Sequence, residues 1–288
     1  SNVSYSSLVT DKEMTGLLIE YSNHTLIESN IIEKTADDGI RILNSHFCNI
    51  KNNIIRNTNA SMSSANAINI TASNETTIEG NTIMNVGGNG IYLHSLSSIR
   101  ITGLYIRHNT ISQSSNSGIR VTGGPTNTEI SENSILYSLG NAISIYSAEK
   151  SIIKDNIVEN GNSHGLYISK CKKMNVSFNI INNFHFKAIY LISSESINIS
   201  YNECALSYEG IYGSSGFSIL IKGNYIHSIS YRGIYISSNA HHFTLEENII
   251  TKNHYGIYLY GDNCTFTKNS FISNSIGIFL RSVSEDNL

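Results

Sequence analysis

The chain has 288 residues, of which 14% are charged, with a net charge of −3, one proline and no tryptophan. Isoleucine, serine and asparagine number 46, 44 and 37, a composition of strand-forming and turn-forming residues that predicts an all-β protein. The longest apolar runs fall well short of the ~20 residues of a membrane span, and the lack of a basic stripe argues against nucleic acid as the main partner.

Two sequence markers recur along the chain in alternation. The first has the form small–aliphatic–x–aliphatic in all but one of its copies, and successive copies start 21 to 28 residues apart. The starts are Gly16, Gly39, Ala67, Gly90, Gly118, Ala142, Gly165, Ala188, Gly210, Gly233, Gly256 and Gly277. The second marker is an asparagine, at Asn30, Asn53, Asn81, Asn109, Asn133, Asn156, Asn179, Asn202, Asn224, Asn248 and Asn269.

This regularity predicts a solenoid of about 12 coils with about 23 residues each. One coil cannot bury its aliphatic side chains alone, whereas stacked coils share a continuous core. A period near 23 residues accommodates three short parallel strands and their corners. We expect the asparagines to stack at one corner, and the small residue of each repeat to occupy a bend or a close backbone approach. Proline is rare because the N–H groups of each coil bond to the next coil.

The two markers resemble those of right-handed parallel β-helix proteins of the pectin-lyase-like superfamily, over residues 16 to 280. The resemblance implies an extracellular, cell-surface or phage-virion protein that acts on polysaccharides, although no signal peptide is visible in this chain. We expect a single domain over residues 1–288 that is part of a longer protein. The superfamily contains lyases, hydrolases, epimerases, tailspikes and non-catalytic proteins, so the resemblance leaves the reaction open.

The residue before each tetrapeptide and its third residue are expected to face solvent on one side of the rod. In the second coil this rule selects Asp38 and Arg41, with Asp37 beside them. Insertions in 57–65 and after Leu93 could form walls around this cluster. A glycoside hydrolase needs two carboxyl groups about 5 to 9.5 Å apart, so Asp37 and Asp38 are the candidate pair for that alternative.

Asp37-Asp38-Gly39-Ile40 and Ser163-His164-Gly165-Leu166 resemble two polygalacturonase motifs. In that family the two motifs lie on adjacent coils. Here Asp38 and His164 are five coils apart, about 24 Å at the spacing of parallel strands. The chain is therefore not expected to be a polygalacturonase of the standard type.

A second group of candidate residues lies on coils 7 to 11. Its ionisable residues, on consecutive coils, are His164, Lys187, Glu209 and Arg232. Beside them are Tyr167, Tyr190, Tyr212 and Tyr235, with Tyr208, Tyr231 and His254 one residue further back. The cations could receive a substrate carboxylate, the tyrosines could hold sugar rings, and Lys187, Tyr212 or His164 could act as a base. This pattern favours lyase-like cleavage of an acidic glycan.

A non-catalytic role is the remaining alternative, as a glycan-binding tailspike, adhesin or periplasmic scaffold. The tailspike version implies a homotrimer. No cofactor is expected, and although Asp37 and Asp38 could contact a divalent cation, no ligand set completes its shell. Cys48, Cys171, Cys204 and Cys264 are too far apart for a zinc pattern and are expected to be buried thiols.

Overall fold

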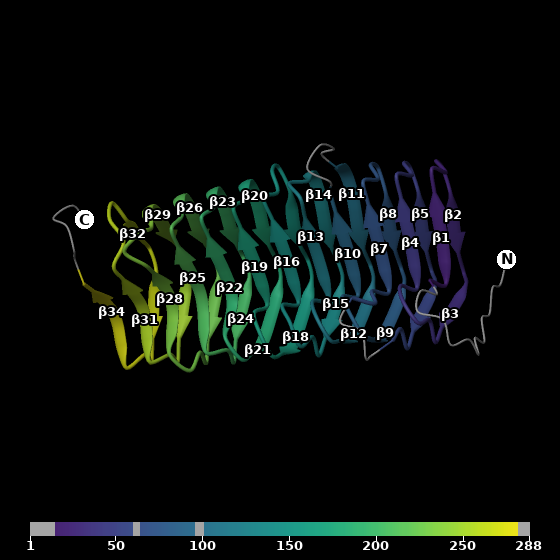
Figure 1. Cartoon of the computed structure of the whole chain (residues 1–288). Coiled ribbons are helices and arrows are strands. Elements are labelled where there is room, and N and C mark those ends of the chain that lie inside the picture. The colour runs from purple at the N-terminus through teal and green to yellow at the C-terminus, as the bar shows by residue number, and fades with distance from the viewer. Residues whose placement is uncertain (1–14, 60–63, 96–100, 282–288) are drawn as a thin grey trace.

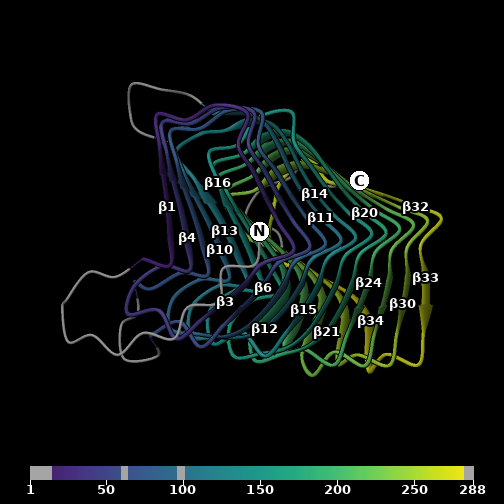
Figure 2. The same cartoon turned by 90° about the vertical axis from the view of Figure 1, so that its right-hand side faces the viewer.

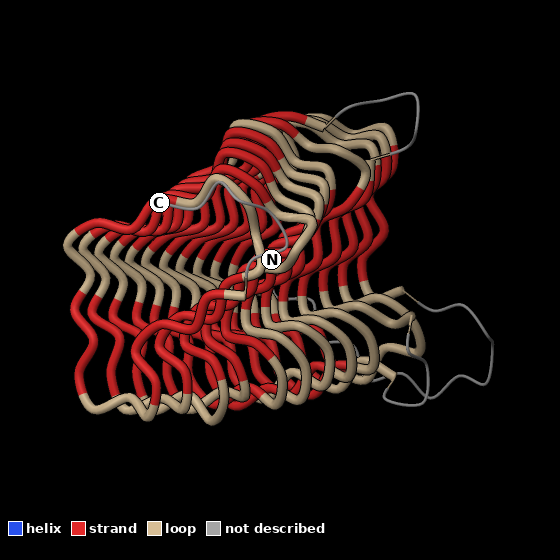
Figure 3. The backbone as a smooth tube through the Cα atoms, turned by 90° about the vertical axis from the view of Figure 1, so that its left-hand side faces the viewer, coloured by secondary structure: helices blue, strands red, loops and turns tan. Residues whose placement is uncertain are grey.

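A computed structural model describes residues 15–59, 64–95 and 101–281, and these residues form a parallel β-solenoid. Three sheets surround the long axis of the rod, as the view along that axis shows (Figure 2). The described residues contain strands, turns and loops and no helix (Figure 3), so none of them forms a helix able to cross a membrane.

The first sheet, here called sheet A, has 12 strands that lie side by side along the rod (Figure 1). Its strands are β1 (Leu17–Glu20), β4 (Ile40–Leu43), β7 (Ile68–Thr71), β10 (Ile91–His94), β13 (Ile119–Thr122), β16 (Ile143–Tyr146), β19 (Leu166–Ser169), β22 (Lys187–Ile192), β25 (Glu209–Ser214), β28 (Arg232–Ile236), β31 (Tyr255–Leu259) and β34 (Ile276–Leu280).

Sheets B and C have 11 strands each. Sheet B comprises β2 (Leu26–Glu28), β5 (Asn49–Lys51), β8 (Thr77–Glu79), β11 (Thr102–Arg107), β14 (Thr126–Ser131), β17 (Ile152–Lys154), β20 (Lys172–Ser177), β23 (Glu195–Ser200), β26 (Phe217–Lys222), β29 (His241–Glu246) and β32 (Thr265–Thr267). Sheet C comprises β3 (Ile31–Glu33), β6 (Ile54–Arg56), β9 (Thr82–Val86), β12 (Thr110–Ser114), β15 (Ser134–Leu136), β18 (Ile157–Gly161), β21 (Ile180–Phe184), β24 (Glu203–Ala205), β27 (Tyr225–His227), β30 (Ile249–Thr251) and β33 (Ser270–Ile272).

Each strand pairs in parallel with the strand of the next coil, so equivalent repeat positions stack directly. The 12 tetrapeptides lie in sheet A in the expected order, which confirms the predicted fold class. Burial alternates along the strands, as in β4, where Ile40 and Ile42 are fully buried and Arg41 and Leu43 are partly exposed. The inward aliphatic side chains of successive coils form one continuous core.

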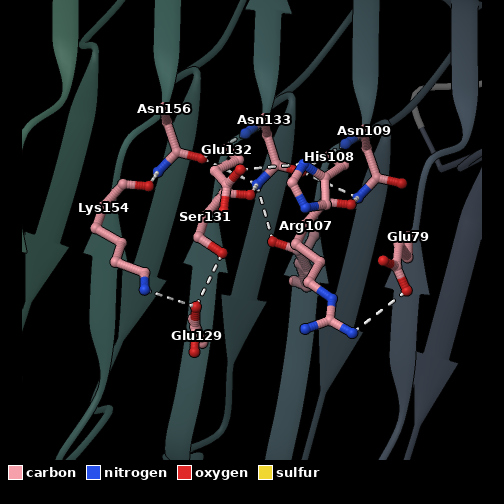
Figure 4. A network of polar contacts seen from close by, with 11 residues as sticks. Glu79, Arg107, His108, Asn109, Glu129, Ser131, Glu132, Asn133, Lys154 and Asn156 are labelled. Atoms are coloured by element: carbon pink, nitrogen blue, oxygen red, sulfur yellow. Dashed lines mark hydrogen bonds and ion pairs between the residues drawn. The ribbon is translucent and has the colours of Figure 1, made fainter.

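The predicted asparagine stack is present at the corner between sheets B and C. Asn156 is representative: its Oδ1 accepts hydrogen bonds from the backbone N (3.0 Å) and Nδ2 (2.9 Å) of Asn133. Its own Nδ2 donates to the backbone oxygens of Ile130 and Lys154 and to Oδ1 of Asn179. Each asparagine thus satisfies buried polar groups of its own coil and of its two neighbours (Figure 4).

Charged side chains on the outer face of sheet B also pair between coils. Arg107 contacts Glu79 at 3.4 Å, and Lys154 contacts Glu129 at 3.3 Å (Figure 4). These residues are partly exposed, so each pair contributes little to stability.

The small residue that opens each repeat is required by close packing. A Cβ added at Gly39 would lie 2.6 Å from the backbone oxygen of Ala67 and 2.6 Å from Cγ2 of Ile55. The left-handed backbone conformation occurs elsewhere, at the residue before each stacked asparagine, such as Asp155 with φ of 56°. Close approach, rather than an unusual dihedral angle, therefore explains the small residue. The four cysteines are buried free thiols, as expected.

Candidate functional site

The third residue of each tetrapeptide forms a straight column on the outer face of sheet A. Parallel register joins them in the order Leu18, Arg41, Asn69, Tyr92, Arg120, Ser144, Tyr167, Tyr190, Tyr212, Tyr235, Tyr258 and Phe279. The N-terminal part of this column is polar, and the C-terminal part is aromatic. Sheet A therefore presents two surfaces of different chemistry.

The residue before each tetrapeptide was expected to face solvent, and this expectation is wrong for much of the rod. Asp38, Asn66, Asn89, Ser117 and Glu209 are all buried. In the N-terminal half these side chains form a second ladder, in which Asn66 Oδ1 accepts from the backbone N (3.0 Å) and Nδ2 (2.8 Å) of Asn89. The chain enters sheet A at this position, and the side chain bonds the equivalent residue of the neighbouring coil.

Asp38 is fully buried and begins this second ladder. Its Oδ1 accepts hydrogen bonds from the backbone N (2.8 Å) and Nδ2 (3.0 Å) of Asn66. Its Oδ2 accepts from Arg41 Nε (2.7 Å) and Asn69 Nδ2 (2.7 Å). With four donors and no route to solvent, Asp38 has the surroundings of a structural carboxylate, and the geometry does not favour a hydrolase pair with Asp37.

Asp37 and Arg41 lie at one end of an open pocket of about 560 Å³ over β4 to β13. Asp37 Oδ2 accepts a hydrogen bond from Arg41 Nη2 at 2.6 Å. Desolvation opposes the charge of Arg41, but the two aspartates outweigh it and raise the pKa of the guanidinium. The expected walls lie partly outside the described residues, because 60–63 and 96–100 belong to the two insertions.

Glu209 lies between Lys187 and Arg232, as their order in the sequence suggested. The Lys187 Nζ to Glu209 Oε2 distance is 3.5 Å, and Arg232 Nη1 donates to Glu209 Oε1 at 3.0 Å. Only 6% of the Glu209 side chain is exposed, against 18% for Lys187 and 17% for Arg232. The cluster holds two cations and one carboxylate, so it carries one excess positive charge.

Both cations also pack against tyrosine rings. Lys187 Nζ lies 5.0 Å from the ring centre of Tyr190 and 4.8 Å from that of Tyr212. Arg232 Cζ lies 4.2 Å from the Tyr235 ring centre and 4.4 Å from that of Tyr258. These contacts hold the charges beneath the aromatic surface.

The tyrosine column is continuous from β19 to β31. Ring centres are 5.4 Å apart for Tyr167 and Tyr190, 5.0 Å for Tyr190 and Tyr212, 4.7 Å for Tyr212 and Tyr235, and 5.6 Å for Tyr235 and Tyr258. Burial, followed by the charge of neighbouring groups, raises the pKa of Tyr212 above its ordinary value. Tyr212 is therefore poorly suited to act as a base and better suited to bind or donate a proton.

His164 packs against Tyr167 and Tyr190 at the N-terminal end of this column. Burial, with a contribution from the charge of Lys187, lowers the pKa of His164 to about 4, so the ring is neutral near pH 7. The backbone N of Lys187 donates to His164 Nδ1 at 3.3 Å, which places the ring proton on Nε2. In this tautomer Nε2 can donate a hydrogen bond but cannot accept a proton.

The remaining candidates form a neighbouring row at the entrance to sheet A. The Tyr208 and Tyr231 ring centres are 5.6 Å apart, and those of Tyr231 and His254 are 6.1 Å apart. Arg232 Nη2 donates to the Tyr231 hydroxyl at 3.1 Å, which links this row to the cation cluster. The row therefore widens the aromatic surface.

Tyr258 and Tyr260 were not selected from the sequence. They are joined on this face by a hydrogen bond between their hydroxyl groups. Their hydroxyl oxygens are 3.1 Å apart, and Arg281 Nη1 donates to the Tyr260 hydroxyl at 3.1 Å. The hydrogen bond with Tyr260 raises the pKa of Tyr258, while the hydrogen bonds from Tyr258 and Arg281 lower the pKa of Tyr260. Only Tyr258 belongs to a repeat position that the sequence could have revealed.

The two surfaces are well separated, since Asp38 precedes β4 and His164 precedes β19, five strands further along sheet A. They cannot contribute to one set of reacting atoms. In the described part of the chain, no group of three or more His, Cys, Asp or Glu residues lies close enough to hold a metal ion.

Comparison with solved structures finds similar folds at low sequence identity. The A-module of mannuronan C-5 epimerase AlgE6 from Azotobacter vinelandii is 11% identical with a TM-score of 0.77, over 94% of this chain and 82% of that chain. A variant of the periplasmic alginate epimerase AlgG is 13% identical with a TM-score of 0.61, over 90% and 76%. The GH136 lacto-N-biosidase from Eubacterium ramulus is 12% identical with a TM-score of 0.59, over 82% and 51%.

At these identities the likeness concerns the fold alone. A comparison with curated proteins gives no match by sequence. The family model of the right-handed β-helix region matches residues 2–103, 66–203 and 176–288. Because these matches span nearly the whole chain and the described residues wind as a parallel solenoid, the chain belongs to the right-handed β-helix family.

Proposed function

We propose that this protein binds and cleaves an acidic polysaccharide on the face of sheet A formed by β19 to β31, by lyase-like chemistry. The observation that carries the proposal is the in-register column of five tyrosines with Lys187 and Arg232 beneath it. Successive coils are about 4.8 Å apart, which is similar to the length of one sugar ring. Each coil can therefore offer one aromatic contact to one sugar unit.

The charge of this face favours an acidic substrate. Glu209 neutralises one of the two cations, and the second leaves a net positive charge that a substrate carboxylate can pair with. Burial and the tyrosine rings reduce the contact of both cations with water, which strengthens such a pair. A neutral glycan would gain the aromatic contacts without this charge pairing.

The Tyr258 and Tyr260 pair supports a route for elimination next to a carboxylate. Arg281 donates a hydrogen bond to the Tyr260 hydroxyl and stabilises its anionic form, so Tyr260 is the better base for the proton on the carbon beside the carboxylate. As that C–H bond breaks, its electrons form a carbon–carbon double bond and the bond to the leaving sugar oxygen breaks. Tyr258, whose raised pKa keeps it protonated, can give its proton to that oxygen.

Two similar structures are consistent with this substrate class, since their names describe epimerases of mannuronan and alginate. The name of a third describes a lacto-N-biosidase, which supports a carbohydrate substrate in general. One of these proteins is described as periplasmic, which supports a proposed location outside the cytoplasm. This support comes from fold-level analogy, whereas the residues of sheet A carry the proposal.

The test is incubation of the protein with polygalacturonate, alginate and hyaluronan while the ultraviolet absorbance of an unsaturated product is recorded. We expect turnover of at least one polymer, loss of turnover with retained binding in Tyr260→Phe, and weaker binding in Lys187→Ala and Arg232→Ala. Tyr137→Phe, an exposed tyrosine outside sheet A, is the matched control. Unchanged activity in Tyr260→Phe would remove the assigned base.

A non-catalytic glycan-binding module is the second candidate. It is favoured by the fact that Lys187, Glu209 and Arg232 already satisfy one another without a substrate. The same assay separates the two functions, since this module would bind an acidic polymer in affinity electrophoresis and release no unsaturated product.

A further inference from the structure

The pocket over β4 to β13 has no role in the proposed cleavage, because it lies on a different part of sheet A. It is an open depression of about 560 Å³ whose floor includes the column residues Arg41, Asn69, Tyr92 and Arg120. A volume of this size accommodates a small ligand rather than a single ion. Its lining is polar, with asparagine side chains and a single aromatic ring, Tyr92.

Charge is distributed unevenly between the two ends of this pocket. At one end Arg41 is bound by both Asp37 and Asp38, so these three residues together carry one negative charge. At the other end the side chain of Arg120 forms no ion pair or hydrogen bond with any described residue, and its Nε is buried without a partner. The pocket thus has a negative end and a positive end.

Arg120 is held in place by aromatic rings on both neighbouring coils. Its Cζ lies 5.9 Å from the ring centre of Tyr92 and 5.7 Å from that of Tyr146. These contacts orient the guanidinium but satisfy none of its N–H groups. The buried Nε is enclosed by protein, so a ligand reaches Arg120 through the terminal nitrogens, whose planar arrangement matches a carboxylate.

A polar acceptor without a partner lies two coils away. Asn69 donates through Nδ2 to Asp38, which fixes the orientation of the amide, and its Oδ1 is buried without a hydrogen-bond partner. Like Arg120 Nε, this oxygen is enclosed by protein, so Asn69 contributes to the polar floor of the pocket and is assigned no bond to the ligand. Tyr92 lies between Asn69 and Arg120 in the column and offers a ring face to a sugar.

We infer that this pocket binds an acidic–neutral disaccharide unit, with the uronate carboxylate on Arg120 and the neutral sugar towards Asp37. Asp37 disfavours a second carboxylate at its end, so a unit with two uronates should fit less well. The inference shares with the proposed function the acidic class of the glycan, and it requires no catalysis.

Calorimetric titration with three disaccharides tests this assignment: glucuronosyl-N-acetylglucosamine, digalacturonate and cellobiose. The Tyr260→Phe background prevents turnover. We expect the acidic–neutral disaccharide to bind most tightly and cellobiose most weakly. Arg120→Gln should weaken binding of the acidic–neutral disaccharide at least tenfold, about the value of a lost charged hydrogen bond. Asp37→Asn should reduce the difference in affinity between the acidic–neutral disaccharide and digalacturonate.

Arg120→Lys is the control for a folding defect in Arg120→Gln. It keeps the positive charge near the tyrosine rings but removes the planar guanidinium group. It should show an intermediate loss of affinity. Arg107→Gln on sheet B is the matched control and should bind as the parent does. Equal affinity for cellobiose and the acidic–neutral disaccharide would overturn the inference, as would unchanged affinity in both Arg120 variants or no binding at all.

These outcomes are separable from those of the proposed function. If acidic polymers are not cleaved but the disaccharide binds in an Arg120-dependent manner, only the proposed cleavage fails. If polymers are cleaved in a Tyr260-dependent manner while both Arg120 variants bind disaccharides normally, only the pocket assignment fails.

Discussion

Asp38 shows how burial decides the role of a single carboxylate. Its two oxygens accept four hydrogen bonds from Asn66, Asn69 and Arg41, and its side chain is fully buried. Asp38→Ala should lower the free energy of unfolding by about 2 to 3 kcal/mol, because buried donors lose their acceptor while Arg41 keeps Asp37. Urea titration measures this loss.

Asp37→Ala is the control, since Asp37 is partly exposed and makes one contact with Arg41. Its effect should stay within about 1 kcal/mol. If Asp38→Ala is as stable as Asp37→Ala but loses activity on a glycan, Asp38 is functional rather than structural.

His164 should make stability depend on pH. Its pKa is lowered from 6.5 in a flexible chain to about 4 in the folded protein, so between these values the unfolded chain binds more protons. Above about pH 6.5 His164 is neutral in both states and does not reduce the free energy of unfolding. As the pH falls towards about 4, His164 reduces the free energy of unfolding by up to roughly 3 kcal/mol. His164→Phe should remove this dependence in urea titrations across that range, whereas His242→Gln, at an exposed histidine, should retain it.

At the scale of elements, the regular positions were predictable and the irregular ones were not. The stacked position of Asn156 holds asparagine in successive coils, because the side chain there must satisfy the same backbone groups each time. The second ladder was missed because it mixes Asp38, Asn66 and Ser117, so that no single residue type marks the position. The pairing of Tyr258 with Tyr260 depends on the direction of two side chains, which a period cannot reveal.

The asparagine stack should stabilise the coils unequally along the rod. Asn156→Ala would remove the acceptor of the Asn133 backbone N and the side-chain donor to the backbone oxygens of Ile130 and Lys154. We expect a loss of about 3 kcal/mol in the free energy of unfolding. Asn269→Ala, in the last described coil that has this asparagine, should cost about 1 kcal/mol because its surroundings are partly exposed. Equal losses in both variants would contradict a role that depends on burial.

The whole molecule is a rod in which position along the axis decides chemistry. The twelve strands of sheet A present a polar pocket near one end and an aromatic, cationic face towards the other. Both surfaces lie on the same sheet, so a single long glycan following the axis could contact them in turn. The parallel register makes this possible, because it keeps equivalent side chains in line over every coil.

This geometry predicts how affinity depends on glycan length. The five tyrosines from Tyr167 to Tyr258 span roughly 20 Å, so each added sugar should gain one ring contact until about five units are bound. Dissociation constants for size-defined acidic oligosaccharides, measured with Tyr260→Phe, should fall up to that length and then level off. Tyr212→Ala, in the middle of the column, should make the affinity level off at a shorter oligosaccharide. Tyr137→Ala should leave the dependence of affinity on length unchanged. Constant affinity from the disaccharide upwards would show that the column does not act as an extended binding face.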